Sequence, residues 1–170
     1  MKRLLSRRSL IAATAAAGAS GARAAPRDRP NILWLVSEDN NPYVGAYGDR
    51  LAHTPTIDRL PAQGVLYRNA YSTAPVCAPS RFALITGAYA ETCAPAQHMR
   101  ATAQLPKGWL TTPQFMRQAG YHCTNNAKTD YNCDLDAAAI WDEQGARAHW
   151  HSRRPGQPFF SVFNYGTTHE

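Results

Sequence analysis

An apolar run, Asn31-Ile32-Leu33-Trp34-Leu35-Val36, stops abruptly at the polar segment Ser37-Glu38-Asp39-Asn40-Asn41. The run carries apolar side chains on both faces, which predicts a buried strand of a parallel sheet. The carboxylates of Glu38 and Asp39 follow that strand directly, and α/β sheets bind their ligands beyond the carboxyl ends of their strands. Taken alone, however, two adjacent acidic residues are more often a solvated turn.

The rest of the chain alternates between patterns typical of helices and of strands. A helix is predicted to begin at Thr54 and Pro55 and to end early at Pro61, with Ile57, Leu60 and Val65 facing the core. Further helices are predicted over residues 80–86, 111–119 and 137–150, and further strands over residues 65–71, 121–126 and 158–164. This alternation predicts an α/β sheet.

Residues 1–25 are typical of a secretory signal peptide. Basic residues up to Arg8 precede an apolar, Ala-rich stretch over residues 10–17 and a small-x-small cleavage site, Ala22-Arg23-Ala24. The apolar stretch is too short to span a bilayer. Ser6-Arg7-Arg8-Ser9-Leu10-Ile11 resembles a twin-arginine signal, although ordinary basic leaders also contain adjacent arginines. We therefore expect this chain to be a bacterial protein that export machinery delivers to the periplasm or the exterior. We expect it to have no stable membrane span.

The charge balance argues against a nucleic-acid partner. The chain holds 18 Lys and Arg against 12 Asp and Glu, and five of the basic residues lie in the predicted signal. The remaining 13 basic residues against 12 acidic ones leave no basic patch of the kind that nucleic-acid binding requires.

Four cysteines, Cys77, Cys93, Cys123 and Cys133, follow no zinc-binding spacing. An exported protein can form disulfides, and a pair among the last three is open. Cys77 differs because a Pro-Ser-Arg sequence and a predicted helix follow it closely. A helix N-terminus and a guanidinium together favour an anion. A cysteine considered by itself is nevertheless more often a buried structural residue or half of a disulfide.

The longer run from Cys77 to Gly87, CAPSRFALITG, closely resembles the sulfatase signature C-x-P-S-R-x-x-L-x-T-G at all seven fixed positions. In that family a maturase oxidises the cysteine to formylglycine, whose hydrated aldehyde is the nucleophile. The resemblance implies an alkaline-phosphatase-like α/β fold with a mixed, mostly parallel sheet flanked by helices. It also implies a sulfuric ester hydrolase in which Arg81 helps to bind the sulfate.

Residues 30–39 look like the opening strand of the same family, which ends in two metal-binding carboxylates. Many members have two aspartates there, whereas this chain has Glu38 and Asp39. Ligation by carboxylate oxygens suits a hard cation, and we expect Ca²⁺ in preference to Mg²⁺.

The resemblance continues toward the end of the chain. Lys128 stands where a strand delivers a lysine to the sulfate, and Asp130 replaces a histidine that often assists formylglycine turnover. His98 is a candidate second imidazole and equally a simple loop histidine. His169 follows the strand over residues 158–164 and is the candidate proton donor to the leaving alcohol.

The similarity covers about residues 30–170, whereas the relatives are much longer and draw further metal ligands and a second lysine from later segments. We therefore expect residues 26–170 to be a truncated, N-terminal part of a sulfatase catalytic domain that is inactive alone. The expected substrate is a sulfated small molecule or glycan. Two alternatives remain: a phosphonate or phosphodiester hydrolase of the same superfamily, and an inactive secreted remnant that at most binds a cation or a sulfated glycan.

Overall fold

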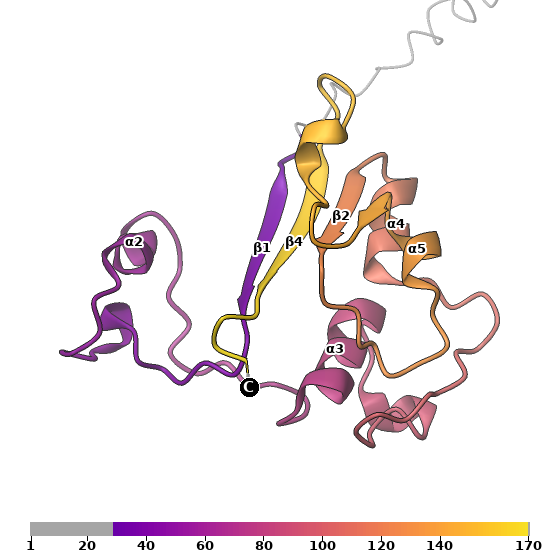
Figure 1. Cartoon of the computed structure of the whole chain (residues 1–170), viewed down its shortest axis with the longest axis horizontal. Helices are drawn as coiled ribbons and strands as arrows, with labels where there is room; N and C mark the ends of the chain where they lie inside the picture. Colours follow the sequence, from indigo (N-terminus) through magenta and orange to yellow (C-terminus); the bar gives the residue numbers. More distant parts are fainter. Residues whose placement is uncertain (1–28, 170) are drawn as a thin grey trace, which may run out of the picture.

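The computed structural model describes residues 29–169, so the predicted signal peptide over residues 1–25 lies outside the described residues. A sheet with helices packed against it forms the main body, and the segment around helix α2 stands beside strand β1 (Figure 1). Within residues 29–169, no helix is both long and apolar enough to cross a membrane.

The sheet contains four strands in the order β1-β4-β2-β3, and every neighbouring pair is parallel. Their bounds are β1 (Ile32–Ser37), β2 (His122–Asn126), β3 (Glu143–Gln144) and β4 (Phe159–Tyr165). The α/β class and three of the strand predictions are thereby confirmed. Because all pairs are parallel, the carboxyl ends of β1, β4 and β2 lie at one edge of the sheet.

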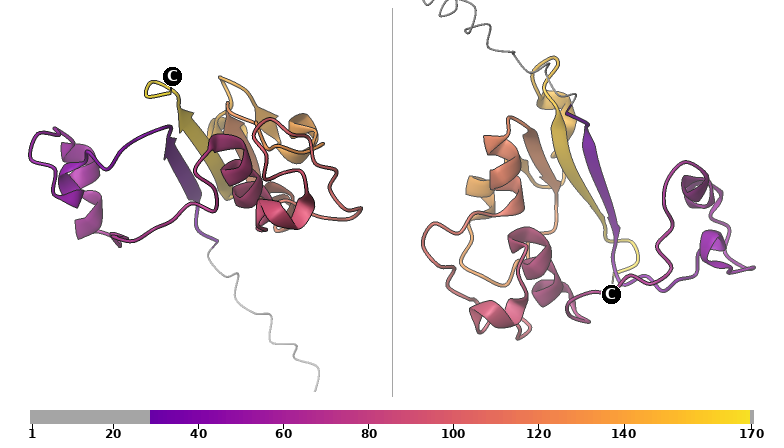
Figure 2. Two further views of the ribbon diagram at one scale, coloured as in Figure 1. Left: turned by 90° about the horizontal axis from the view of Figure 1, so that it is seen from below. Right: turned by 180° about the vertical axis from the view of Figure 1, so that it is seen from behind.

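Three helices cover one face of this sheet: α3 (Cys77–Thr86), α4 (Thr112–Gln118) and α5 (Ala137–Ile140). They lie across the strands from α2, as the rear view in Figure 2 shows. Helix α4 begins with a capping box between Thr111 and Gln114 and is followed by Gly120 at a positive φ. The short helix η4 (Trp150–Ser152) contacts β4, where the rings of Trp150 and Phe159 stack.

Phe160, in the central strand β4, is the centre of the main apolar core. Its ring contacts Trp34 edge-on at 4.9 Å and Trp141 at 5.7 Å between centroids. Ile85 of α3 and Ile140 of α5 belong to the same cluster. A second buried cluster surrounds Phe82 beneath α3. Burial of such side chains contributes roughly 1.5–3 kcal/mol each.

The prediction that β1 is buried on both faces is wrong for the described residues. Leu33 and Leu35 are 44% and 62% exposed, whereas Trp34 and Val36 pack on the core. The reason is geometric: β1 pairs with β4 at the edge of the described sheet, and the helices cover one face.

The outer segment, residues 43–71, also departs from expectation. It contains η1 (Gly45–Tyr47), α2 (Pro55–Asp58) and η2 (Leu60–Ala62), with no strand over residues 65–71. Pro61 does shorten the helix as expected. The core assignments are wrong, however, because the residues concerned are exposed: Ile57 46%, Leu60 59% and Val65 76%.

Polar contacts organise the outer segment instead of a core. The Asp58 carboxylate accepts hydrogen bonds from the Thr54 hydroxyl at 2.9 Å and from the Ala46 N–H at 2.7 Å. The Gly45 N–H donates to the Thr54 hydroxyl at 2.9 Å. These bonds close the loop between η1 and α2 without burying their apolar side chains.

Two helix boundaries need correction. The helix predicted over residues 137–150 ends at Ile140, because Trp141 turns into the core beside Phe160 and Gly145 takes a positive φ. Helix α3 begins at Cys77 instead of after Pro79, and proline is tolerated in a first helical turn. Cys77 is therefore the first residue of the helix.

Candidate active site

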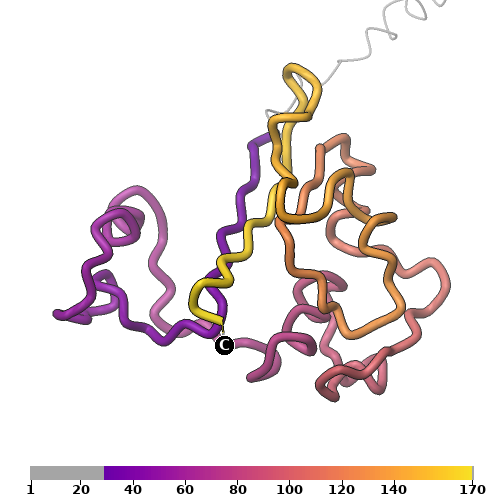
Figure 3. The backbone as a smooth tube through the Cα atoms, viewed as in Figure 1, coloured from indigo at the N-terminus to yellow at the C-terminus, as the bar shows by residue number. Residues whose placement is uncertain are grey.

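The predicted site residues gather at the carboxyl edge of the sheet. Glu38 and Asp39 follow β1, Lys128 follows β2, and His169 follows β4. The chain after β4 turns back beside the end of β1 (Figure 3), where the Glu38 N–H donates to the Tyr165 carbonyl at 3.2 Å. The Thr168 hydroxyl also donates to the Glu38 carbonyl. Helix α3 brings Cys77 and Arg81 to the same edge.

The carboxylate of Glu38 is the most enclosed charge in this group, with 6% of the residue exposed. One oxygen accepts a hydrogen bond from the Arg81 guanidinium, and the other accepts one from Lys128 Nζ at 2.8 Å. Burial raises the pKa of Glu38, but the bonds and charges of Lys128 and Arg81 outweigh it and hold the pKa below its usual value. The predicted metal ligand thus touches both predicted sulfate-binding cations.

Arg81 is buried and connects three acceptors. Besides Glu38, its Nη2 donates to Asn164 Oδ1 at 2.9 Å, and its Nε lies 3.4 Å from Asp130 Oδ1. The forked guanidinium is fixed by Glu38 just after β1, by Asn164 on β4 and by Asp130 in the loop after β2. Because Nη2 donates to Glu38 and Asn164 and Nε faces Asp130, a tetrahedral oxyanion has to displace at least one of these partners to be bound bidentately.

Asn164 and Asn125 were not predicted as site residues. Asn164 Nδ2 donates to Asn125 Oδ1 at 3.1 Å and to the Asn126 carbonyl at 2.9 Å. Asn125 Nδ2 in turn donates to the Lys128 carbonyl at 3.0 Å. The two amides thereby position the loop that carries Lys128. The signal available for them was an asparagine near the end of each of two predicted strands, over residues 121–126 and 158–164.

Lys128 lies in a strongly acidic environment. Burial lowers its pKa, but the hydrogen bond to Glu38 and the charges of Asp130, Glu38 and Cys77 raise it above the usual value. Lys128 is therefore a fixed cation at neutral pH. Its position between Glu38 and the cleft allows it to meet an anion there.

Asp39 and His169 complete the site on its open side. Asp39 adopts the left-handed region with φ of 50°, which aspartate tolerates better than most residues. Its Oδ2 lies 3.9 Å from His169 Nε2. Both side chains are exposed, so each can change rotamer when a ligand binds.

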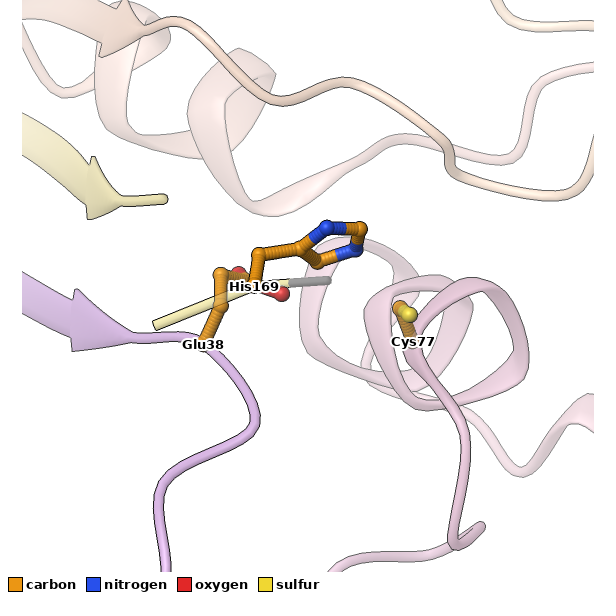
Figure 4. A group of neighbouring side chains, drawn as sticks. All are labelled: Glu38, Cys77 and His169. Carbon is orange, nitrogen blue, oxygen red and sulfur yellow. The ribbon is translucent and has the colours of Figure 1, made fainter. Parts of the chain in front are cut away.

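Cys77, Glu38 and His169 lie close together although they come from three different parts of the chain (Figure 4). One donor atom of each lies within 4.8 Å of the other two. Cys77 and His169 also line an open cleft of about 450 Å³. The remaining lining residues are Ala78, Met99 to Thr102, and Lys128 to Cys133.

The two weaker candidates differ. Asp130 lines the cleft and pairs with Arg81. His98 is exposed and is not among the residues that line the cleft; its carbonyl accepts a hydrogen bond from Asn132 Nδ2 at 2.6 Å. The contribution of His98 here is made by its backbone, which helps to hold the wall formed by residues 99–102.

All four cysteines are free thiols in the structure. Burial raises the pKa of Cys123 to about 12 and that of Cys133 to about 11. Cys93 is buried in the second core cluster. Cys77 is the cysteine placed at a helix N-terminus beside Lys128 and facing the cleft.

Comparison with known proteins identifies relatives of this chain. The sulfatase family model matches residues 30–154. An ulvan-active sulfatase of Formosa agariphila is 44% identical over 155 residues, covering 84% of this chain and 26% of that protein. Human iduronate 2-sulfatase is 33% identical over 94 residues, covering 55% of this chain and 17% of that protein. The chain thus spans about a quarter or less of these relatives.

Two solved structures share the fold. BT4656, in complex with its substrate D-glucosamine-2-N,6-O-disulfate, matches 84% of this chain and 35% of its own with a TM-score of 0.69 at 18% identity. BT1596, a 2-O glycosaminoglycan sulfatase, matches 81% of this chain and 35% of its own with a TM-score of 0.64 at 22% identity. Because the sulfatase family model matches residues 30–154, which is most of its length, the chain belongs to the sulfatase family.

Proposed function

We propose that this chain supplies part of the active site of a sulfuric ester hydrolase whose nucleophile is made from Cys77. The observation that carries the proposal is the convergence of Cys77, Lys128 and His169 on one cleft, with Arg81 and Glu38 behind it. Two cations beside a helix N-terminus favour an oxyanion, and the imidazole stands on the open side. As formylglycine, residue 77 would supply a nucleophilic hydroxyl through its hydrated aldehyde.

The chain's own residues divide the remaining work. Arg81 and Lys128 bind the sulfate oxygens and stabilise the charge that develops on them. His169 donates a proton to the departing alcohol from the side facing solvent. Asn164 and Asn125 position Arg81 and the Lys128 loop through the bonds described above.

The donor set fits a hard divalent cation, and we propose Ca²⁺. Glu38 and Asp39 offer carboxylate oxygens at the end of β1, as Ca²⁺ and Mg²⁺ prefer. Since both oxygens of Glu38 are engaged by Arg81 and Lys128, at least one contact has to loosen for Glu38 to become a ligand. The cation would supply positive charge next to the sulfate.

A sulfated glycan is the proposed substrate class. Support comes from the names of the relatives, which act on ulvan, on iduronate 2-sulfate or on glycosaminoglycans. The cleft is open and bordered by exposed loops, which suits one residue of a larger sugar chain. We also propose export through the predicted signal.

The test combines modification with turnover. The protein is expressed from its complete gene together with a formylglycine-generating maturase. Three versions are made: the wild type, Cys77→Ala and Cys133→Ala. Mass spectrometry should find formylglycine at residue 77 in the wild type and in Cys133→Ala. Turnover of sulfated oligosaccharides should be abolished by Cys77→Ala alone. Unchanged turnover in Cys77→Ala would overturn the nucleophile assignment.

Paired substrates separate the alternatives. Faster turnover of an aryl phosphodiester than of an aryl sulfate would favour a phosphodiester hydrolase. Unmodified Cys77 together with no Ca²⁺ uptake in calorimetry would favour an inactive remnant.

A further inference from the structure

Before any modification, the cleft contains a thiol, an imidazole and a carboxylate directed toward one point. Cys77 comes from the first turn of α3, Glu38 from the end of β1, and His169 from the loop after β4 (Figure 4). One donor atom of each lies within 4.8 Å of the other two. Within residues 29–169, this is the one group of at least three His, Cys, Asp or Glu residues whose donor atoms all lie that close to one another.

The kinds of donor atom distinguish this group from the Ca²⁺ ligands proposed above. A thiolate and an imidazole with one carboxylate form the mixed set that Zn²⁺ prefers, whereas Ca²⁺ takes oxygen ligands. No cysteine spacing in the sequence indicated zinc, because the three ligands are brought together by the fold and not by a local motif.

The geometry permits coordination after small movements. Zn–S bonds of about 2.3 Å and Zn–N and Zn–O bonds of about 2.0–2.2 Å place tetrahedral ligands roughly 3.3–3.7 Å apart. The donors therefore have to approach one another by up to about 1.5 Å. His169 is exposed and can rotate for this purpose. The fourth position would face the cleft, as in zinc sites with three protein ligands and a water.

The charges around the group balance a divalent cation. Arg81 and Lys128 already contact the Glu38 carboxylate and oppose metal binding. Asp130 pairs with Arg81 and offsets its charge, and Asp39 adds a negative charge beside His169. A Cys77 thiolate adds one more negative charge, and a carboxylate has lone pairs left beyond the two in use.

We propose that the unmodified chain binds Zn²⁺ through Cys77 Sγ, His169 and Glu38. On binding, the Cys77 thiol releases its proton to solvent, and a Zn–S bond forms without any redox change. The proposal's second half rests on the proposed function: once Cys77 is converted to formylglycine the sulfur ligand is gone, and the preference passes to an oxygen-binding cation. A bound Zn²⁺ would also shield the thiol that maturation has to oxidise.

The first experiment needs no substitution. The full chain, produced without a maturase, is treated with iodoacetamide with Zn²⁺, with Ca²⁺ or with neither, and alkylation of each cysteine is followed by mass spectrometry. Zn²⁺ should slow alkylation of Cys77 roughly tenfold or more, as the loss of a free thiolate requires. Equal rates with Zn²⁺ and Ca²⁺ would overturn the proposal.

The second experiment identifies the ligands. Co²⁺ replaces Zn²⁺ and reports a thiolate ligand by a charge-transfer band in the near ultraviolet. The band should be absent in Cys77→Ser, and His169→Gln should weaken Co²⁺ binding roughly tenfold or more. His53→Gln, an exposed histidine of the outer segment, is the matched control and should bind as the wild type does. A band that persists in Cys77→Ser, or unchanged affinity in His169→Gln, would refute the site.

The outcomes also separate this inference from the function it partly rests on. If zinc binding fails, formylglycine formation and sulfate ester turnover can still be observed with the maturase present. If those fail instead, the Co²⁺ band of the thiol form is unaffected. Zinc binding of undiminished strength after measured conversion of Cys77 would contradict the second half of the proposal.

Discussion

The outer segment and the sheet with its helices contain similar apolar residues, yet they bury them very differently. Phe82 and Phe160 in the main body are 0% and 1% exposed, whereas Leu51 and Tyr71 in the outer segment are 97% and 89% exposed. In the main body each apolar side chain meets others from distant elements. In the outer segment, neighbouring residues are joined by local polar contacts such as Asp58 with Thr54. An apolar residue is thus buried where the topology supplies a second surface.

Truncation of Phe160 should give the largest difference in stability between the main body and the outer segment. Phe160→Ala should lower the free energy of unfolding by about 3–5 kcal/mol, because it leaves a cavity beneath Trp34 and Trp141. Leu60→Ala in the outer segment should change it by less than about 0.5 kcal/mol. Urea unfolding followed by fluorescence measures both. A loss of equal size in Leu60→Ala would show that the outer segment has a core of its own.

Removal of the buried Arg81 cation should have the second-largest effect on the free energy of unfolding. Arg81→Met leaves the enclosed Glu38 with Lys128 as its remaining partner and should cost about 2–3 kcal/mol. Arg59→Met, at an exposed position of the outer segment, should stay within about 0.5 kcal/mol. The same unfolding assay compares them. If Arg81→Met were neutral, the Glu38 ion pairs would not be important for stability.

The capped helix of the main body offers a smaller comparison. Thr111→Ala removes the capping box of α4 and should cost about 1 kcal/mol. Thr56→Ala within α2, an exposed position, should have almost no effect. Thermal unfolding by circular dichroism would resolve the difference. Equal shifts in melting temperature would indicate that the cap adds little here.

The smallest expected difference is in how the stability of the wild type and of Glu38→Gln depends on pH under acidic conditions. The pKa of Glu38 is lower in the folded chain than in the unfolded one, so its contribution is present above about pH 4.3 and is lost as the pH falls through the folded pKa. Stability in that range should rise with pH more steeply in the wild type than in Glu38→Gln. Leu60→Ala, in the outer segment, changes no ionisable group and is the control; it should keep the wild-type slope. Identical slopes in all three chains would contradict the role given to Glu38.

The sequence was most informative where a local pattern or the family signature was compatible with one structure only. Strands β1, β2 and β4 and the convergence of Cys77, Arg81 and Lys128 followed from residue order and the family signature. The exposure of Leu33 and Leu35 did not, because it depends on which elements cover the second face of the sheet. Asn164 was missed for a related reason: its importance comes from partners on β2 and α3, which no local pattern reveals.

The prediction of a helix over residues 137–150 was wrong because contacts with distant residues outweigh the local helix propensity after Ile140. Its alanines favour a helix, but Trp141 is held in the core by Phe160 and by its hydrogen bond to the Tyr131 hydroxyl at 3.0 Å. The double pairing of Glu38 was equally hidden, since the sequence presented it as a metal ligand and its two cations as sulfate ligands.

Strand β4 occupies the middle of the described sheet although it is the last of its strands to be synthesised. Asn31, just before β1, meets Phe159 of β4 across 128 residues of chain. At a synthesis rate of about 5–20 residues per second, β1 waits roughly 6–26 seconds on the ribosome for its partner. During that interval Trp34 and its apolar neighbours have no strand to pair with, so their apolar surface stays exposed while the chain is synthesised.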